Sequence, residues 1–228
     1  MSNFASMGGG TEFKTVDAGT YDALLFGVVF IGVQKQKPFK GEAKKPQPQV
    51  KFLFEIPGLL RDDGQTMTMA KTVNAMTSER SNCVKIINAI ANRTLNAKEL
   101  NDLVSSSEPL KTLVGSAVVV TVDKFTTEDN KEISYIKDFL PLDARIPKPE
   151  ATRPNLFFTP LVPDMQVFGE LTKYTKEQIM TAENNKDFPR ELHQAHVADQ
   201  EQESGNVPAS TAQQPELAKG DESLGAIQ

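Results

Sequence analysis

The sequence predicts a mainly β fold in which five strands form one small domain and a polar segment follows it. Three features lead to this prediction. Apolar residues alternate along several segments of strand length, and a helical spacing replaces the alternation only between the third and fourth of these segments. The C-terminal part of the chain is acidic and poor in aromatic residues. A chain of 228 residues has room for one ordinary domain with such additional segments.

The first predicted strand covers residues 19–34, which are rich in β-branched and aromatic side chains. Both of its alternating faces are largely apolar, as is typical of a long strand that is buried on both sides. Gly27 and Gly32 interrupt it. They predict bends or bulges, which allow a strand to curl around a small barrel.

The second and third predicted strands form a meander. Residues 49–57 alternate so that their two phenylalanines share one buried face, while Lys51 points to the opposite face. The dipeptide Asp63-Gly64 is a hairpin turn signal. Residues 65–73 then form the returning strand.

Two helices are predicted after the third strand. Residues 77–92 carry apolar side chains at helical spacing, and Thr77 or Ser78 can cap this helix. A shorter helix is predicted at 96–104, with Asn96 as its N-cap.

The last two predicted strands are residues 116–125 and 132–142, which a polar turn separates. Five strands with a helical connection between the third and the fourth is the order of an OB barrel, which is small and partly open. We therefore expect a mainly β chain with a five-stranded OB-like barrel.

The segments after the barrel differ from it in composition. The sequence is rich in proline after residue 142, holds enough apolar residues at 155–171 for an extended arm or a hairpin, and could form a short helix at 175–185. From residue 191 onward it has no Phe, Tyr or Trp, and such a segment cannot bury enough surface to offset its ordering entropy. The predicted parts are a disordered N-terminus, the OB-fold domain, a Pro-rich linker with a partly ordered arm, and a disordered acidic tail, at residues 1–12, 13–142, 143–190 and 191–228.

The residue inventory argues against several function classes. A single cysteine, Cys83, permits neither an intrachain disulfide nor a cysteine zinc site. His193 and His196 are one helical turn apart, but no cysteine or acidic cluster completes a metal site, and no base lies near a nucleophile in the predicted domain. We expect no enzyme, no metal and no cofactor. No apolar run reaches the roughly 18 residues of a membrane helix, and no secretory signal is visible, so we expect a cytosolic protein with no membrane partner.

Charge is distributed unevenly along this acidic chain. Residues 34–93 hold eleven basic and five acidic side chains, whereas 181–228 hold three basic and nine acidic ones. The basic region begins with "QKQKPFKGEAKKP", residues 34–46, which connects the first two predicted strands. In an OB fold this connection flanks the ligand face of strands two and three.

The lysine-rich loop has two interpretations. Charge alone is equally compatible with a solvated hairpin loop that keeps an exposed edge soluble. The length of the loop, its position and its single aromatic residue favour single-stranded nucleic acid, because lysines attract phosphates and a ring stacks on an unpaired base. The expected contacts are five loop lysines, one loop phenylalanine and two lysines on the sheet: Lys35, Lys37, Phe39, Lys40, Lys44, Lys45, Lys51 and Lys71. For the residues of the final hairpin, Lys124, Phe125, Tyr135 and Lys137, surface charge or core packing is at least as good an explanation.

These segments together resemble bacteriophage-encoded single-stranded DNA-binding proteins with an OB fold. The resemblance covers residues 13–142 and rests on the order of "GTYDALLFGVVFIGVQ", the basic loop, "VKFLFEIPG", "TSERSN" before the helix, "LVGSAVVVTVDKF" and "EISYIKDFLPL". It implies binding of single-stranded DNA in phage replication or recombination, in the host cytoplasm, with an acidic tail that docks replication or recombination proteins. The end "SLGAIQ" departs from one common form of that tail, because it has neither a terminal aromatic nor a final acidic residue.

The sequence leaves two alternatives open. The barrel of a phage structural or assembly protein could serve protein contacts, with the basic loop bound to an acidic partner. The acidic tail could compete with nucleic acid for a positive groove to which it is tethered, or it could act only as a solubilising segment.

Overall fold

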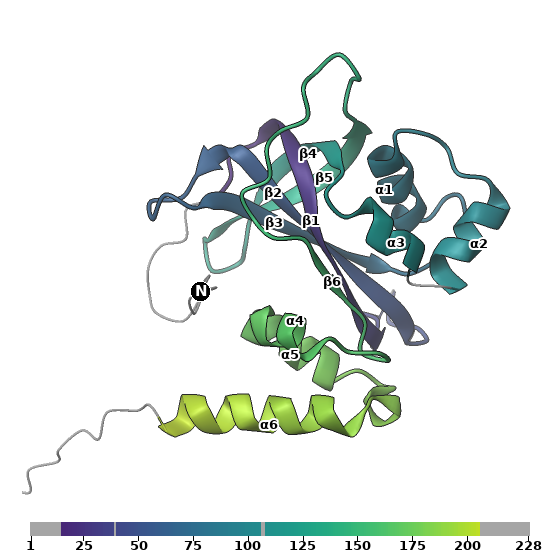
Figure 1. The fold of residues 1–228 in the computed structure, drawn as a ribbon, viewed down its shortest axis with the longest axis vertical. Coiled ribbons are helices and arrows are strands. Elements are labelled where there is room, and N and C mark those ends of the chain that lie inside the picture. Colours follow the sequence, from purple (N-terminus) through teal and green to yellow (C-terminus); the bar gives the residue numbers. More distant parts are fainter. Residues whose placement is uncertain (1–14, 39, 106–107, 206–228) are drawn as a thin grey trace, which may run out of the picture.

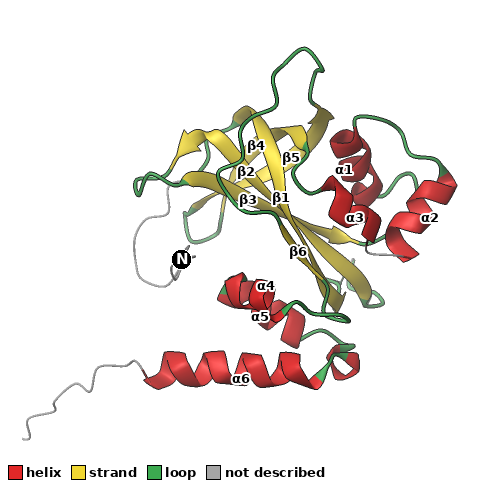
Figure 2. Cartoon of the chain, in the orientation of Figure 1, coloured by secondary structure: helices red, strands yellow, loops and turns green. Residues whose placement is uncertain are grey.

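The computed structural model describes residues 15–38, 40–105 and 108–205 of the chain. A sheet with the strand order β3-β2-β1-β4-β5 forms its centre, and a sixth strand, β6, pairs with β1 (Figures 1 and 2). The strands are β1 (Gly19–Gln34), β2 (Gln47–Leu60), β3 (Thr66–Asn74), β4 (Ala117–Thr126), β5 (Glu132–Pro141) and β6 (Leu156–Phe158). The helices are α1 (Asn82–Ala91), α2 (Ala97–Ser105), α3 (Glu108–Leu113), α4 (Met165–Glu170), α5 (Lys173–Met180), η1 (Asn185–Asp187) and α6 (Arg190–Gly205). The prediction of a mainly β chain is confirmed.

Strand β1 organises the sheet because it changes partners along its length. Its first part, from Gly19 to Leu24, pairs antiparallel with β4, and the part from Leu24 onward pairs antiparallel with β2. The ladder with β2 shifts register between Leu25 and Gly27 and again between Phe30 and Val33. Bulges therefore occur at both glycines that predicted them, and the prediction is confirmed.

The connection between β3 and β4 is helical, as expected, but it contains a third helix, α3. Helix α1 begins at Asn82, later than predicted, because the Ser81 hydroxyl accepts a hydrogen bond from the backbone N–H of Val84. The cap is thus Ser81 and not Thr77 or Ser78. Asn96 caps α2 as predicted and accepts from the backbone N–H of Glu99 at 3.0 Å.

Two separate cores lie on opposite sides of β1. The larger core contains the inward side chains of β1 to β5, such as Phe52 and Ile136, and the apolar face of α1. The smaller core lies between the outer side of β1, strand β6 and helices α4 to α6. In Figure 1 these three helices lie below the sheet, and α1 to α3 lie beside it.

The segment after β5 is more ordered than the sequence predicted. Where we expected an arm or a hairpin, three residues form β6, parallel to β1, and helix α4 follows. Helix α6 occupies the start of the expected disordered tail, and its Leu192 is fully buried in the smaller core. The expectation of disorder from residue 191 is therefore wrong up to residue 205. The rest of that tail, 206–228, and the expected disordered N-terminus, 1–12, lie outside the described residues. Within the described ranges, no helix combines the length and the apolar character needed to cross a membrane.

Gly32 provides a test of how the two parts of the chain fit together. It has φ +77°, and a Cβ at this position would lie 2.7 Å from Cβ of Ala182 and 2.9 Å from the ring of Phe188. We predict that Gly32→Ala lowers the free energy of unfolding by roughly 2–5 kcal/mol, since overpacking adds to the cost of the left-handed backbone. Urea denaturation measures this change.

Gly64→Ala is the matched control for this prediction. Gly64 has a similar φ of +75°, but nothing lies within 4 Å of the added Cβ. Its substitution should therefore cost only the backbone term, about 1–2 kcal/mol. Equal losses of stability in the two variants would show that Gly32 is not packed against the C-terminal helices.

Candidate nucleic-acid interface

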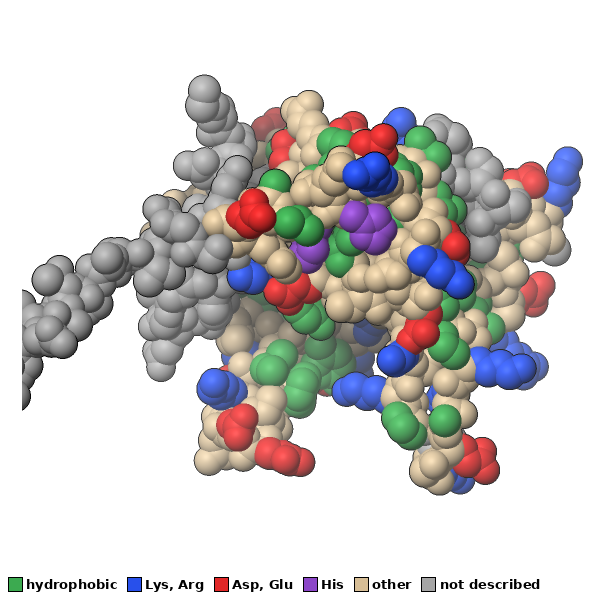
Figure 3. Space-filling view, turned by 90° about the horizontal axis from the view of Figure 1, so that it is seen from below, with side chains coloured by type: hydrophobic (Ala, Val, Ile, Leu, Met, Phe, Trp, Pro, Cys, Tyr) green, Lys and Arg blue, Asp and Glu red, His purple; other side chains and the backbone are tan. Residues whose placement is uncertain are grey.

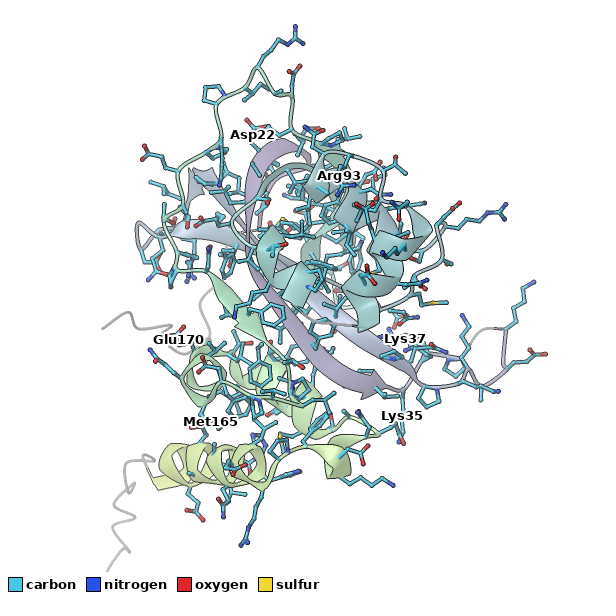
Figure 4. The ribbon with its side chains drawn as sticks, turned by 45° about the vertical axis from the view of Figure 1, so that its right-hand side comes forward. Asp22, Lys35, Lys37, Arg93, Met165 and Glu170 are labelled. Carbon is cyan, nitrogen blue, oxygen red and sulfur yellow. The ribbon has the colours of Figure 1, made fainter. Side chains whose placement is uncertain are left out.

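The lysine-rich loop between β1 and β2 is exposed, as predicted. Figure 4 shows Lys35 and Lys37 near the end of β1, where the loop begins. The side chain of Lys35 is 86% exposed, and its Nζ lies 3.2 Å from the carboxylate of Glu183. All five loop lysines are exposed: Lys35, Lys37, Lys40, Lys44 and Lys45. Phe39, the aromatic residue predicted to stack on a base, lies outside the described residues.

The C-terminal helices fix the start of this loop. The backbone N–H of Val33 donates to Oδ1 of Asn184 at 2.8 Å, and its carbonyl accepts from the N–H of Glu183 at 2.8 Å. The side-chain amide of Gln34 donates to the carbonyl of Gln178 at 2.8 Å. The direction in which the loop leaves the sheet therefore depends on residues about 150 positions later in the chain.

Lys51, which we expected on the nucleic-acid face of the sheet, is only 5% exposed. Its Nζ donates to Oγ1 of Thr175 at 2.9 Å and to Oε1 of Gln178 at 2.6 Å, and it lies 5.1 Å from the ring centre of Tyr174. Alternation correctly placed Lys51 opposite the face of Phe52, but helix α5 covers that side. The expected exposure is wrong, and burial lowers the pKa of Lys51 to about 8.

Lys71 is half-buried and does not lie on the outer side of the sheet. It lies opposite Phe52 in the β2–β3 ladder and therefore on the core side of β3. Its Nζ donates to the backbone carbonyl of Ile136 on β5 at 2.6 Å. Burial lowers the pKa of this amine as well. Lys51 and Lys71 thus make hydrogen bonds within the fold and are less exposed than the loop lysines.

The outer face of the β4–β5 hairpin holds an exposed aromatic pair. The side chains of Phe125, Ile133 and Tyr135 are 48%, 42% and 37% exposed. The rings of Phe125 and Tyr135 are 5.7 Å apart in an edge-to-face arrangement. Lys137, on the same hairpin, pairs with Asp123 at 2.9 Å.

The sequence contained a signal for these rings. Phe125 lies opposite Ile133 and Asp123 opposite Tyr135, so these four side chains share one side of the hairpin. An aspartate in the same alternating row as an aromatic residue marks a solvent-facing row. This polarity would have favoured exposed rings over core packing.

Strand β3 has an open outer side next to this hairpin. Thr68, Ala70 and Thr72 alternate with core residues and are exposed. The end of β3 reaches the lysine loop, where Asn74 donates to the side-chain carbonyl of Gln36 at 3.2 Å. We call the exposed side chains of β3 and of the β4–β5 hairpin the β3–β5 face; they are Thr68, Ala70, Thr72, Phe125, Ile133, Tyr135 and Lys137.

Other surfaces and side chains provide weaker candidates for a functional site. In Figure 3, which views the molecule from the side of the C-terminal helices, basic and acidic side chains are interspersed around the two histidines. Cys83 is buried in the larger core, and burial raises the pKa of its thiol to about 11. No group of three or more His, Cys, Asp or Glu suitable for a metal ion occurs in the part of the chain that the structure describes.

Comparisons with known proteins add no assignment. The chain matches no protein-family model, and no curated protein matches its sequence.

The environment of Lys51 predicts a pH dependence of stability. Its pKa in the folded chain is about 8, below its ordinary value of 10.5, so the unfolded chain binds more protons between these two pH values. Stability therefore rises with pH through this window. Relative to Lys51→Met, the free energy of unfolding of the wild type should rise by at most about 3 kcal/mol between pH 7 and 10.5.

Urea denaturation at several pH values measures this difference. At neutral pH the variant should be as stable as the wild type or more stable, because a methionine avoids the desolvation of the amine. Lys98→Met, which removes an exposed lysine of α2, is the control and should follow the wild-type profile. Parallel profiles of the wild type and Lys51→Met would contradict the assignment of a desolvated amine.

Proposed function

We propose that this chain is a single-stranded DNA-binding protein with an OB-like barrel, which coats and protects unpaired strands during phage replication or recombination. The observation that carries the proposal is the combination of the exposed lysine loop with the exposed rings of the β3–β5 face. Strand β3 connects the two, since one end of it contacts the loop at Gln36 and its middle contacts β5 through Lys71.

The connectivity of the sheet supports an OB-like barrel. Strands β1, β2 and β3 form a meander, β1 also pairs with β4, β4 pairs with β5, and helices connect β3 to β4. The contact of Lys71 with Ile136 brings β3 to β5, the two ends of the sheet. This is the order in which an OB barrel approaches closure.

The chemistry of the two regions suits a single strand. Lysines of a loop neutralise phosphates and release their counterions, whatever the base sequence. Rings such as those of Phe125 and Tyr135 can stack only on bases that are not already stacked in a duplex. The outer side chains of β3 are small and protrude little between the rings and the loop. A DNA strand would therefore have room to cross this surface.

The second candidate is a phage structural or assembly protein that uses the barrel for protein contacts. Leu161 and Val162, in the connection between β6 and α4, are 60% and 79% exposed and would suit an apolar partner surface better than DNA. Binding of oligonucleotides separates the two candidates.

The loop lysines should determine the salt dependence of binding. Fluorescence anisotropy with labelled oligo-dT at several salt concentrations gives the slope of log affinity against log salt. We predict that the double variant Lys37→Gln, Lys45→Gln reduces this slope by about 1.4, since each neutralised phosphate of a single strand contributes about 0.7.

The control for this prediction removes two exposed lysines elsewhere, Lys98→Gln and Lys148→Gln, and should leave the slope unchanged. If neither the full chain nor a chain that ends at residue 205 binds oligo-dT at low salt, the proposed function is rejected. An equal reduction of the slope in both double variants would instead indicate a non-specific effect of charge.

The aromatic pair should contribute affinity without salt dependence. Phe125→Ala and Tyr135→Ala should each weaken oligo-dT binding by about 1–3 kcal/mol, the usual effect of losing one stacked base, with an unchanged salt slope. Tyr174→Ala removes a ring that is 66% exposed on α5 and should leave binding unaffected. Wild-type affinity in both hairpin variants would exclude stacking at this site.

A further inference from the structure

Strands β3 and β5 are the two end strands of the sheet path, and they lie side by side. Among the described residues, no backbone ladder joins these two strands. The Nζ of Lys71, from β3, donates to the carbonyl of Ile136, from β5, at 2.6 Å. We call this contact the seam.

The position of Lys71 explains why a lysine makes this contact. The residue shares the core side of β3 with Met67, Met69 and Val73, so its aliphatic stem lies along apolar surface. The ammonium group reaches the carbonyl at the edge of the core. A cation donating to a carbonyl forms a stronger hydrogen bond than a neutral donor, which helps to offset the cost of partial burial.

The acceptor carbonyl lies where β5 changes register. The ladder between β4 and β5 shifts between Thr121 and Val122, which pair with Asp138 and Ile136, so Lys137 is the extra residue of a bulge. Both neighbours of Ile136 in sequence, Tyr135 and Lys137, are exposed on the β3–β5 face. The seam therefore holds the point of β5 from which an aromatic ring and a cation project.

We infer that Lys71 is a positioning residue for nucleic-acid binding: it closes the seam and sets Tyr135 and Lys137 against the exposed side of β3, and it does not contact DNA. The inference rests on the proposed function and extends it. It also assigns the path of the bound DNA strand, which crosses the seam from the small side chains of β3 to the ring of Tyr135. It also excludes Lys71 from the residues that neutralise phosphate.

Substitution of Lys71 with two readouts tests this inference. Lys71→Met should weaken binding of oligo-dT about tenfold, the equivalent of one charge-assisted hydrogen bond, and leave the salt slope at its wild-type value. Lys71→Arg should keep most of the wild-type affinity that Lys71→Met loses, because a guanidinium can donate to the same carbonyl of Ile136. Hydrogen exchange measured by mass spectrometry should show faster exchange of the β5 amides in Lys71→Met only. The control Lys98→Met should resemble the wild type in both readouts.

A third measurement uses the wild-type chain and does not depend on the folding of a variant. Lysine acetylation, followed by mass spectrometry, should show Lys37 and Lys45 reactive in the free protein and protected by oligo-dT. Lys71 should react slowly with or without DNA, because its amine is engaged at the seam.

Several results would overturn the inference. A salt slope reduced by about 0.7 in Lys71→Met would indicate a phosphate contact. Unchanged affinity for oligo-dT or unchanged hydrogen exchange of β5 in that variant would contradict the positioning role. Strong protection of a reactive Lys71 by DNA in the wild type would contradict it as well. If the wild type binds no oligonucleotide, the proposed function fails and the positioning role fails with it. Hydrogen exchange needs no DNA and would still show whether the seam holds β5.

Discussion

The burial of β1 on both sides is the constraint on which the rest of the structure depends. Val28 belongs to the larger core with α1, while Val29 and Ile31 belong to the smaller core with α4 to α6. Full burial of one such side chain contributes about 1.5–3 kcal/mol. Without the C-terminal helices, an apolar row at the centre of the sheet would face water. The segment after β5 is therefore part of the same folded unit.

This constraint decides which side of the sheet is available to a ligand. The C-terminal segment covers the outer side of β1 and β2, where Lys51 contacts α5 and the buried carboxylate of Glu55 accepts hydrogen bonds from Thr152. The outer side of β3 and of the β4–β5 hairpin stays open. The ligand face that we propose therefore lies over β3 and the β4–β5 hairpin, and not over the second and third strands, where the sequence led us to expect it. The same C-terminal segment holds the first residues of the lysine loop, through Val33 and Gln34.

Local patterns in the sequence were sufficient to predict strands β1 to β5 and helices α1 and α2, whereas long-range packing determined the elements that follow them. Alternation identified the strands, and Gly27 and Gly32 identified the bulges, since both depend on neighbouring residues only. The helix α6 could not be predicted in this way. Its one fully buried apolar residue, Leu192, packs against a core assembled by strands and helices far away in the sequence.

The two sheet lysines differ in how far the sequence could place them. For Lys51, alternation gave the correct side of β2 but could not reveal the helix that covers it. For Lys71 the signal was present: it shares its row with Met67, Met69 and Val73, which indicates the core side of β3. An interpretation that weighed this row before the charge would have placed Lys71 on the core side of the sheet.

The lysines of this chain also show why net charge along a sequence window is a poor measure of a binding surface. Lys35 is exposed beside Glu183, Lys51 is buried under α5, and Lys71 is bound to a backbone carbonyl. Only charges near solvent can exchange counterions for phosphates, so of these three lysines only Lys35 could make the affinity of the proposed DNA binding depend on salt. A buried ammonium acts through geometry, because its hydrogen bonds require a fixed position. The electrostatic attraction of a DNA strand and the shape of the surface that binds it are thus separate properties, although lysines contribute to both.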